Sequence, residues 1–140
     1  MTETQRITPF IGYEDAAAAI EWLERAFGFV EDRSARHEQD GVIGHAELEL
    51  EDARIYLSTP SGYANPRRMR EESELARRAY DNPWVIDGLF VQVEDVDAHH
   101  VRARDAGATI LREPEEPGIG QRIYSAEDLE GHRWMFGQPV

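Results

Sequence analysis

Residues 14–29 (EDAAAAIEWLERAFGF) and residues 94–110 (EDVDAHHVRARDAGATI) share one pattern at a separation of eighty residues. Each copy opens with a Glu-Asp pair, which suits the unpaired amides and positive dipole end of a helix N-terminus. The apolar residues at helical spacing are Ile20, Leu23 and Phe27 in the first copy and Ala98 and Val101 in the second. Gly28 and Gly107 end the two predicted helices. The repeat predicts two copies of one structural unit.

Alternation of apolar and polar residues predicts strands on both sides of each helix. The predicted strands are residues 7–13, 44–50 and 54–60 in the first copy and residues 88–94, 121–127 and 132–139 in the second. We therefore predict an α+β fold of two tandem βαβββ modules, with curved mixed sheets and helices on their convex side. The modules span residues 5–60 and 86–139 of a single 140-residue domain. PRRMREESELARRAY (66–80) predicts a helix within the connecting segment, residues 61–85.

The composition limits the kinds of partner and of chemistry. The chain has no cysteine, so a thiol nucleophile, a disulfide and a thiolate metal site are excluded. Twenty-eight acidic residues against fifteen basic ones give a formal net charge of −13, which disfavours nucleic acid as a partner. The N-terminal residues lack the apolar core of a signal peptide, and no stretch is long enough to span a membrane. We expect a soluble cytoplasmic protein.

A family resemblance rests on the same segments. EDVDAHHVRARDAGATILRE (94–113) and RIYSAEDLEGHRWMFG (122–137) resemble the second module of proteins in the vicinal oxygen chelate superfamily, which includes glyoxalases, bleomycin-resistance proteins and extradiol dioxygenases. ITPFIGYEDAAAAIEWLERAFGF (7–29) and GHAELEL (44–50) resemble the first module. Leu129 departs from the family, which usually has proline in a D-P-x-G turn, so the conformation of this turn is in question. The resemblance implies the fold and leaves the activity open.

The resemblance also implies where a metal would bind, on the first and last strand of each module. Carried over by position, the four ligand sites fall on Thr8, Tyr56, Gly88 and Met135. Divalent metals in such sites need imidazole or carboxylate donors, and these four residues provide neither. We expect no metal and no other cofactor.

The strand faces turned away from the helices are predicted to form a concave ligand-binding cleft. Ile7, Ile11 and Tyr13 are expected on the opposite, helix-facing side of the first strand. The candidate ligand-binding residues are Phe10, His45, Glu47, Tyr56, Phe90, Gln92, Tyr124 and Met135. Aromatic rings suit stacking on a flat molecule, and Glu47 suits a cation. His99 and His100 are predicted on a solvated helix surface, whereas Trp84 either covers the cleft or packs in the linker.

Three hypotheses follow. The first is a metal-independent, homodimeric binding protein of the bleomycin-resistance kind, which holds a small aromatic or cationic molecule. The second is an enzyme of the same superfamily, either a lyase or isomerase with His45 or Glu47 as general base, or a dioxygenase-like enzyme with relocated metal ligands. The third is an interaction module without a ligand. The sequence leaves open whether the modules pair within one chain or across the dimer.

Overall fold

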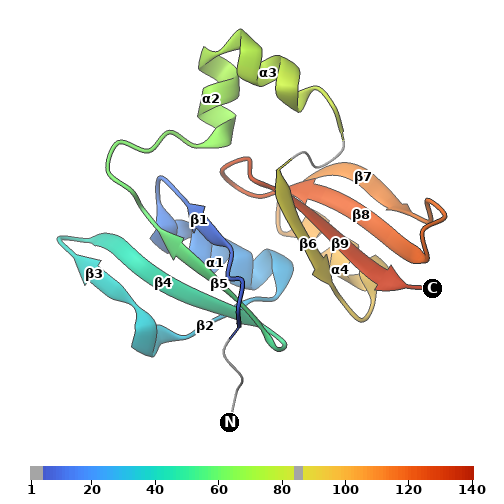
Figure 1. The fold of residues 1–140 in the computed structure, drawn as a ribbon, viewed down its shortest axis with the longest axis horizontal. Coiled ribbons are helices and arrows are strands. Elements are labelled where there is room, and N and C mark those ends of the chain that lie inside the picture. Colours follow the sequence, from blue (N-terminus) through green and yellow to red (C-terminus); the bar gives the residue numbers. More distant parts are fainter. Residues whose placement is uncertain (1–4, 84–86) are drawn as a thin grey trace. The chain divides into compact units, whose positions relative to one another are not determined.

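The computed structural model describes residues 5–83 and 87–140, so Trp84 lies outside the described residues. The chain divides into two compact units, Met1–Ala64 and Asn65–Val140. Figure 1 shows one sheet in each unit, with α1 behind the first and α4 behind the second. No helix in the described part of the chain is both long enough and apolar enough to cross a membrane.

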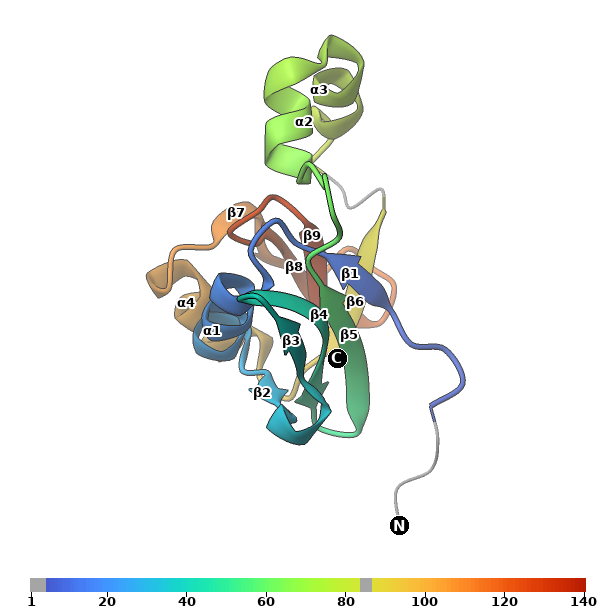
Figure 2. The same cartoon turned by 90° about the vertical axis from the view of Figure 1, so that its left-hand side faces the viewer.

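The first unit consists of one mixed sheet, one main helix and a short 3₁₀ helix. Its elements are β1 (Phe10–Gly12), α1 (Ala16–Phe27), β2 (Val30–Glu31), η1 (Arg33–Ala35), β3 (His37–Gln39), β4 (Val42–Leu50) and β5 (Ala53–Ser58). The strand order is β1-β5-β4-β2, and β3 also pairs with β4. β1 runs parallel to β5, whereas the other pairs are antiparallel. In Figure 2, α1 lies to one side of β4 and β5.

The second unit repeats this connectivity after a helical segment. Its elements are α2 (Pro66–Glu72), α3 (Glu74–Tyr80), β6 (Gly88–Gln92), α4 (Val96–Asp105), β7 (Thr109–Glu115), β8 (Gln121–Glu127) and β9 (Arg133–Pro139). The strand order is β6-β9-β8-β7. β6 runs parallel to β9, just as β1 runs parallel to β5. The predicted duplication of a βαβββ module is therefore confirmed.

The helix ends confirm the pattern from which the repeat was recognised. Asp15 accepts a hydrogen bond from the Ala18 amide at 3.1 Å, and Asp95 accepts one from the Ala98 amide at 3.0 Å. Gly28, which ends α1, has φ of 87° in the left-handed region that glycine adopts without a steric penalty. Both helices are thus capped by local chemistry that the sequence displays.

Each helix buries one stripe of side chains against its sheet. Ile20, Leu23 and Phe27 of α1 are at most 1% exposed, as predicted. The prediction for α4 was wrong, because Ala98 and Val101 are exposed. The buried residues of α4 are Val96, His100 and Ala103. These three also follow helical spacing. A search for apolar residues misses this buried stripe because one of its positions is a polar histidine.

The first strand is shorter than predicted. The sequence pattern indicated a strand over residues 7–13, but β1 begins at Phe10. Pro9 has no amide hydrogen to donate to a neighbouring strand, although its carbonyl accepts a hydrogen bond from the Tyr56 amide at 2.9 Å. Ile7, predicted to pack under the helix, is 84% exposed.

The connecting segment forms two helices and belongs to the second unit. Ser73 ends α2 and caps α3, because its side chain accepts a hydrogen bond from the Ala76 amide. Arg70 of α2 donates to Glu127 of β8 at 2.8 Å. Arg133 of β9 donates to the Glu127 carboxylate at 3.1 Å and to the Tyr80 carbonyl at 2.6 Å. A buried carboxylate between two guanidinium groups therefore fastens the helices to the second sheet.

The turn between β8 and β9 is well formed without the family's proline. Asp128 Oδ1 accepts hydrogen bonds from the amides of Glu130 and His132, at 3.0 and 3.1 Å. Gly131 has φ of 91°, and a Cβ there would lie 2.9 Å from the Arg67 amide nitrogen of α2. The side chain of Asp128 thus provides the constraint that Leu129 cannot.

Candidate functional site

The face of the first sheet opposite α1, which we call the first face, carries four of the eight predicted site residues. It consists of Phe10, His45, Glu47, Glu49, Arg54 and Tyr56. Tyr56 pairs in register with Phe10 on one side and with Glu47 on the other. Phe10 is 61% exposed although it lies on a strand, whereas Leu48, on the opposite face, is fully buried. The strand alternation therefore brings Phe10, His45, Glu47 and Tyr56 to one surface, as predicted.

A polar cluster is centred on Glu47. One carboxylate oxygen lies 2.8 Å from His45 Nε2, and the other accepts a hydrogen bond from Arg54 Nη1. Arg54 also binds Glu49, and it donates to Asp32 Oδ2 at 3.3 Å. The hydrogen bond from His45, followed by that from Arg54, lowers the pKa of Glu47 below its ordinary value. Glu47 is thus an anion at neutral pH.

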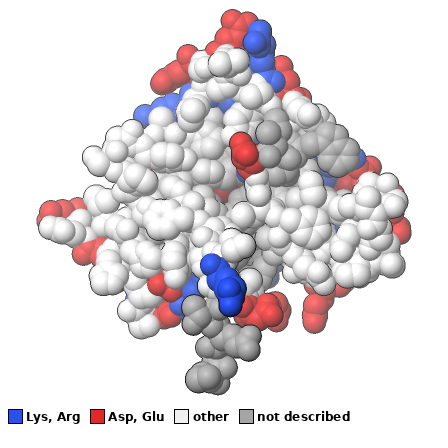
Figure 3. Space-filling view, in the orientation of Figure 1, with Lys and Arg blue, Asp and Glu red and all other residues white. Residues whose placement is uncertain are grey.

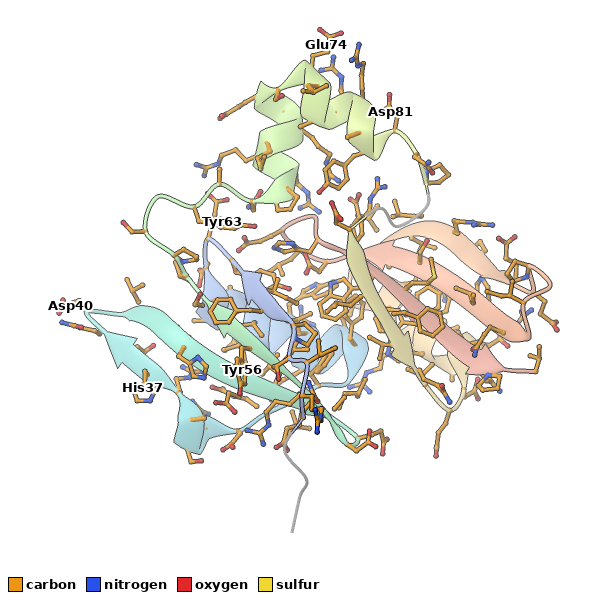
Figure 4. All side chains as sticks on the ribbon, viewed as in Figure 1. His37, Asp40, Tyr56, Tyr63, Glu74 and Asp81 are labelled. Atoms are coloured by element: carbon orange, nitrogen blue, oxygen red, sulfur yellow. The ribbon has the colours of Figure 1, made fainter. Side chains whose placement is uncertain are left out.

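Aromatic rings border this cluster. The ring of Tyr56 lies 4.9 Å from the His45 ring and 6.4 Å from the Phe10 ring, centroid to centroid, edge to face in both cases. His37 of β3 lies 6.2 Å from the His45 ring. Figure 4 shows His37 and Tyr56 on strands of the same sheet. Sequence reasoning missed His37 because β3 is only three residues long and carries no apolar alternation.

The His45–Glu47 pair determines which nitrogen of His45 is available. An ionised carboxylate only accepts hydrogen bonds, so His45 Nε2 must carry the proton that is shared with Glu47. In the neutral ring, Nδ1 is then the acceptor and is able to take a proton. The first face therefore offers a carboxylate-oriented imidazole as well as aromatic surface.

The face of the second sheet opposite α4, which we call the second face, has a different chemistry. It consists of Phe90, Gln92, Arg112, Gln121, Ser125 and Met135. Met135 pairs with Phe90 on one side and with Ser125 on the other. The Phe90 ring is 50% exposed, and a Cβ at Gly137 would lie 2.5 Å from its tip. A side chain at residue 137 would therefore displace the ring from β9.

Tyr124 is not on the second face, and its predicted position was wrong. It pairs with Phe136 under α4, is fully buried, and stacks on the Phe136 ring at 5.2 Å. Its hydroxyl lies 2.6 Å from His99 Nδ1, and burial raises the pKa of Tyr124 well above its ordinary value. The face that carries Tyr124 could not be predicted from alternation, because β8 has apolar residues on both faces: Ile123 on one, Tyr124 and Ala126 on the other.

The two helix histidines also differ from their prediction. His99 is half-buried beside Tyr124, and His100 is buried, with Nε2 2.9 Å from a carboxylate oxygen of Glu113. Neither belongs to a solvated surface. Their environment is the packed layer between α4 and the second sheet.

The residues at the family's metal positions do not fit a divalent ion. Gly88 pairs in register with Arg133, so a guanidinium group lies beside one of these positions. Tyr56 and Met135 contribute a phenol and a thioether, which are poor ligands for such an ion at neutral pH. Among residues 5–83 and 87–140, no group of three His, Asp or Glu side chains is placed to hold a metal.

Charged side chains are intermixed at the surface. Figure 3 shows acidic and basic residues together on the surface, among many uncharged residues. This distribution matches the interspersed charges of the sequence. The expectation that nucleic acid is not a partner stays a prediction.

Comparisons with known proteins agree with this architecture. An uncharacterized protein of Mycobacterium bovis is 31% identical over 134 residues, covering 96% of this chain and 83% of its own length. TioX from Micromonospora sp. ML1 is 27% identical, with a TM-score of 0.69 and 97% of each chain covered. TnmS3, an antibiotic binding protein from Streptomyces sp. CB03234, shares the fold at 18% identity, with a TM-score of 0.66 and coverage of 100% of this chain and 99% of TnmS3.

A family model matches residues 6–136, which is nearly the whole chain. The duplicated module, with a mixed sheet in each unit, is the one that the resemblance implied. The chain therefore belongs to the Glyoxalase/Bleomycin resistance protein/Dioxygenase superfamily.

Proposed function

We propose that this protein binds a small planar aromatic compound with a positive charge, without a metal ion, and that the first face holds the charged part. One observation carries the proposal. Phe10 and Phe90 occupy equivalent positions in the two modules, each beside a last-strand residue, and the two residues are 61% and 50% exposed. A large aromatic residue in solvent on an otherwise well-packed strand suits a flat ligand that covers it on the face of its own sheet.

The charge of the first face supports a cation. Glu47, Glu49 and Asp32 surround the single guanidinium of Arg54. Three carboxylates against one guanidinium leave this cluster negative while His45 is neutral. A cationic ligand would gain from these carboxylates and from the aromatic faces of Phe10 and Tyr56.

The comparisons are compatible with binding as the first hypothesis, although the family name also includes two kinds of enzyme. TnmS3 is an antibiotic binding protein, and the family name includes bleomycin resistance. Each of these describes another protein, and TnmS3 at 18% identity shares only the fold. They make the binding of a small organic molecule a reasonable use of the same faces.

The test is calorimetric titration with proflavine, a planar cation, and acridine, which is neutral at mildly alkaline pH. We expect Phe10→Ala to weaken proflavine binding about fivefold with little salt dependence, since apolar contacts are not screened. We expect Glu47→Gln to weaken it by a similar factor that shrinks with salt, because the Debye length is about 8 Å at physiological ionic strength. Ile7→Ala, which removes an even more exposed apolar side chain outside the first face, is the matched control.

Two results would contradict the proposal. One is that neither compound binds, which would favour an interaction module without a ligand. The other is that binding occurs with the same affinity in Phe10→Ala as in Ile7→Ala, which would place the ligand elsewhere.

The His45–Glu47 pair favours a second candidate function, a metal-free lyase or isomerase. His45 Nδ1 would act as the base, and Glu47 would orient the ring and stabilise its protonated form. In such an enzyme, Glu47→Gln would lower turnover about 100-fold or more with a modest change in affinity. Product analysis of the same compounds, with wild type and Glu47→Gln side by side, separates the two functions.

The metal-free state is tested by elemental analysis of the isolated protein. We expect less than one equivalent of zinc, nickel, manganese or iron per chain, because Thr8, Tyr56, Gly88 and Met135 are poor ligands. One equivalent that a chelator removes with loss of stability would favour the alternative of relocated ligands.

We also propose a homodimer, because β1 and β6 leave strand edges that need cover. Sedimentation should give about 32 kDa, twice the chain mass of 16.0 kDa. A monomer across the micromolar range would exclude it. The cytoplasmic location stays a prediction.

A further inference from the structure

Ser125 is a buried hydroxyl on the second face. Its side chain is 1% exposed, and Oγ finds no hydrogen-bond partner among the residues that the structure describes. A buried polar group left in this state costs about 1–3 kcal/mol, and such groups are rare in folded proteins. Gln121, on the same face of β8, also has a buried Oε1 without a partner in the described part of the chain. This strand therefore presents unmet polar groups toward the second face.

Ser125 borders a cavity that is also lined by Arg112, Glu115 and Met135. The volume of this cavity is about 10 Å³. A space of this size accepts about one oxygen atom. It is therefore large enough for the polar end of a ligand, and too small for a carboxylate or phosphate group.

The charges around the cavity favour a neutral oxygen. Arg112 pairs in register with Ser125 and forms an ion pair with Glu115. Because each charge already faces its opposite, an anionic ligand would have to displace Glu115 from Arg112. The Ser125 hydroxyl needs only a hydrogen-bond acceptor, and a carbonyl oxygen is an acceptor that carries no net charge.

Two apolar side chains next to Ser125 on the second face indicate what the rest of the ligand is. Phe90, Met135 and Ser125 lie on neighbouring strands β6, β9 and β8. Neighbouring strands are about 4.8 Å apart, so the Phe90 and Ser125 positions are separated by about 10 Å. A ring system of two or three fused rings spans this distance. It would contact Phe90 and Met135 while its edge reaches Ser125.

We infer that Ser125 is a specificity-determining residue, whose hydroxyl donates a hydrogen bond to a carbonyl oxygen of a fused-ring ligand lying on Met135 and Phe90. The inference rests on the proposed function, since it assigns one polar contact to an aromatic ligand that lies on the second face. It adds a class of substituent, a ring carbonyl, and a residue that the sequence pattern did not identify.

The experiment compares acridone, which carries a ring carbonyl, with 9,10-dihydroacridine, which has the same three rings and N–H group but a methylene in place of the carbonyl. Ser125→Ala should weaken the binding of acridone about fivefold and leave that of 9,10-dihydroacridine unchanged, since one neutral hydrogen bond is worth about 1 kcal/mol. Phe90→Ala should weaken both compounds. Ser61→Ala, which removes an exposed hydroxyl in the first unit, is the matched control. Affinities are measured by fluorescence titration of each variant.

A second measurement, of stability without ligand, distinguishes a ligand-binding role of Ser125 from a structural one. Without ligand, Ser125→Ala should unfold at the same temperature as wild type or slightly higher, because it removes an unpartnered hydroxyl. A clearly lower midpoint would show that the hydroxyl holds a structural water and would overturn the inference. Equal effects on acridone and 9,10-dihydroacridine, or no effect on either, would overturn it while the proposed function stands. Failure of wild type to bind either compound would overturn the inference alone, because the proposed function is tested separately by proflavine, a cation.

Discussion

The carboxylate of Asp128 is expected to be a main source of stability in the second unit. Asp128 is 1% exposed, and its Oδ1 accepts two backbone amides of the β8–β9 turn. Its Oδ2 accepts a hydrogen bond from Trp134 Nε1 at 3.0 Å, and Trp134 is also 1% exposed. Asp128→Ala would therefore remove three hydrogen bonds at once and leave a buried indole N–H without an acceptor.

The magnitude follows from these contacts. A buried donor left unpaired costs about 1–3 kcal/mol, and the two turn amides add about 1 kcal/mol each if water partly replaces the carboxylate. We expect a loss of about 3–5 kcal/mol in the free energy of unfolding. With an unfolding entropy of about 2.1 cal/mol/K per residue, a 140-residue chain would lose about 10–17 °C in melting temperature.

The assay is thermal unfolding followed by calorimetry and by tryptophan fluorescence. Asp128→Asn keeps one carbonyl oxygen in place, so it should lose about half as much stability as Asp128→Ala. Asp52→Ala, an exposed residue of the β4–β5 turn, is the matched control and should leave the melting temperature unchanged. A loss below about 3 °C for Asp128→Ala would refute the reasoning, because it would mean that water replaces the carboxylate fully.

Two further predictions concern the first face and the packing of α2. The pKa of Glu47, measured by NMR, should lie below the ordinary glutamate pKa and rise in Arg54→Gln. The stability that this lowered pKa contributes is present above the ordinary pKa and is lost as the pH falls through the pKa of the folded state. An unchanged pKa of Glu47 in the variant would contradict the assigned contact with Arg54. Gly131→Ala should destabilise the protein by about 2 kcal/mol or more in denaturant unfolding, because it adds a clash with Arg67 to the cost of positive φ. Gly62→Ala, at φ of 72° with open space around it, should cost only about 1 kcal/mol, and equal losses in the two variants would show that the contact with α2 is unimportant.

Much of the fold could be predicted because the signals are local. Asp15 and Asp95 cap their helices through an amide three residues away, and Gly28 adopts positive φ within the same turn. Such contacts depend on neighbouring residues alone, so they repeat wherever the sequence repeats. The first face could be predicted for a similar reason, because β4 alternates cleanly between buried Leu48 and polar Glu47.

Other parts of the site could not be predicted, because neighbouring elements decide them. In β8, apolar residues occur at both parities, so only the pairing of Tyr124 with Phe136 shows which side faces α4. In α4, the polar residue His100 occupies a buried position beside Tyr124. Local composition contains no information about such a partner.

By itself, the sequence determined that this protein is a duplicated βαβββ chain with capped helices, acidic charge and unsuitable residues at the family's metal positions. These properties come from residue identity and short-range spacing. Only the tertiary structure decided that Glu47 is shared between His45 and Arg54, that Tyr124 is buried, and that Ser125 borders a small cavity. The physical reason is that hydrogen bonding and burial depend on strand register and on packing between segments distant in the sequence, which no local pattern specifies.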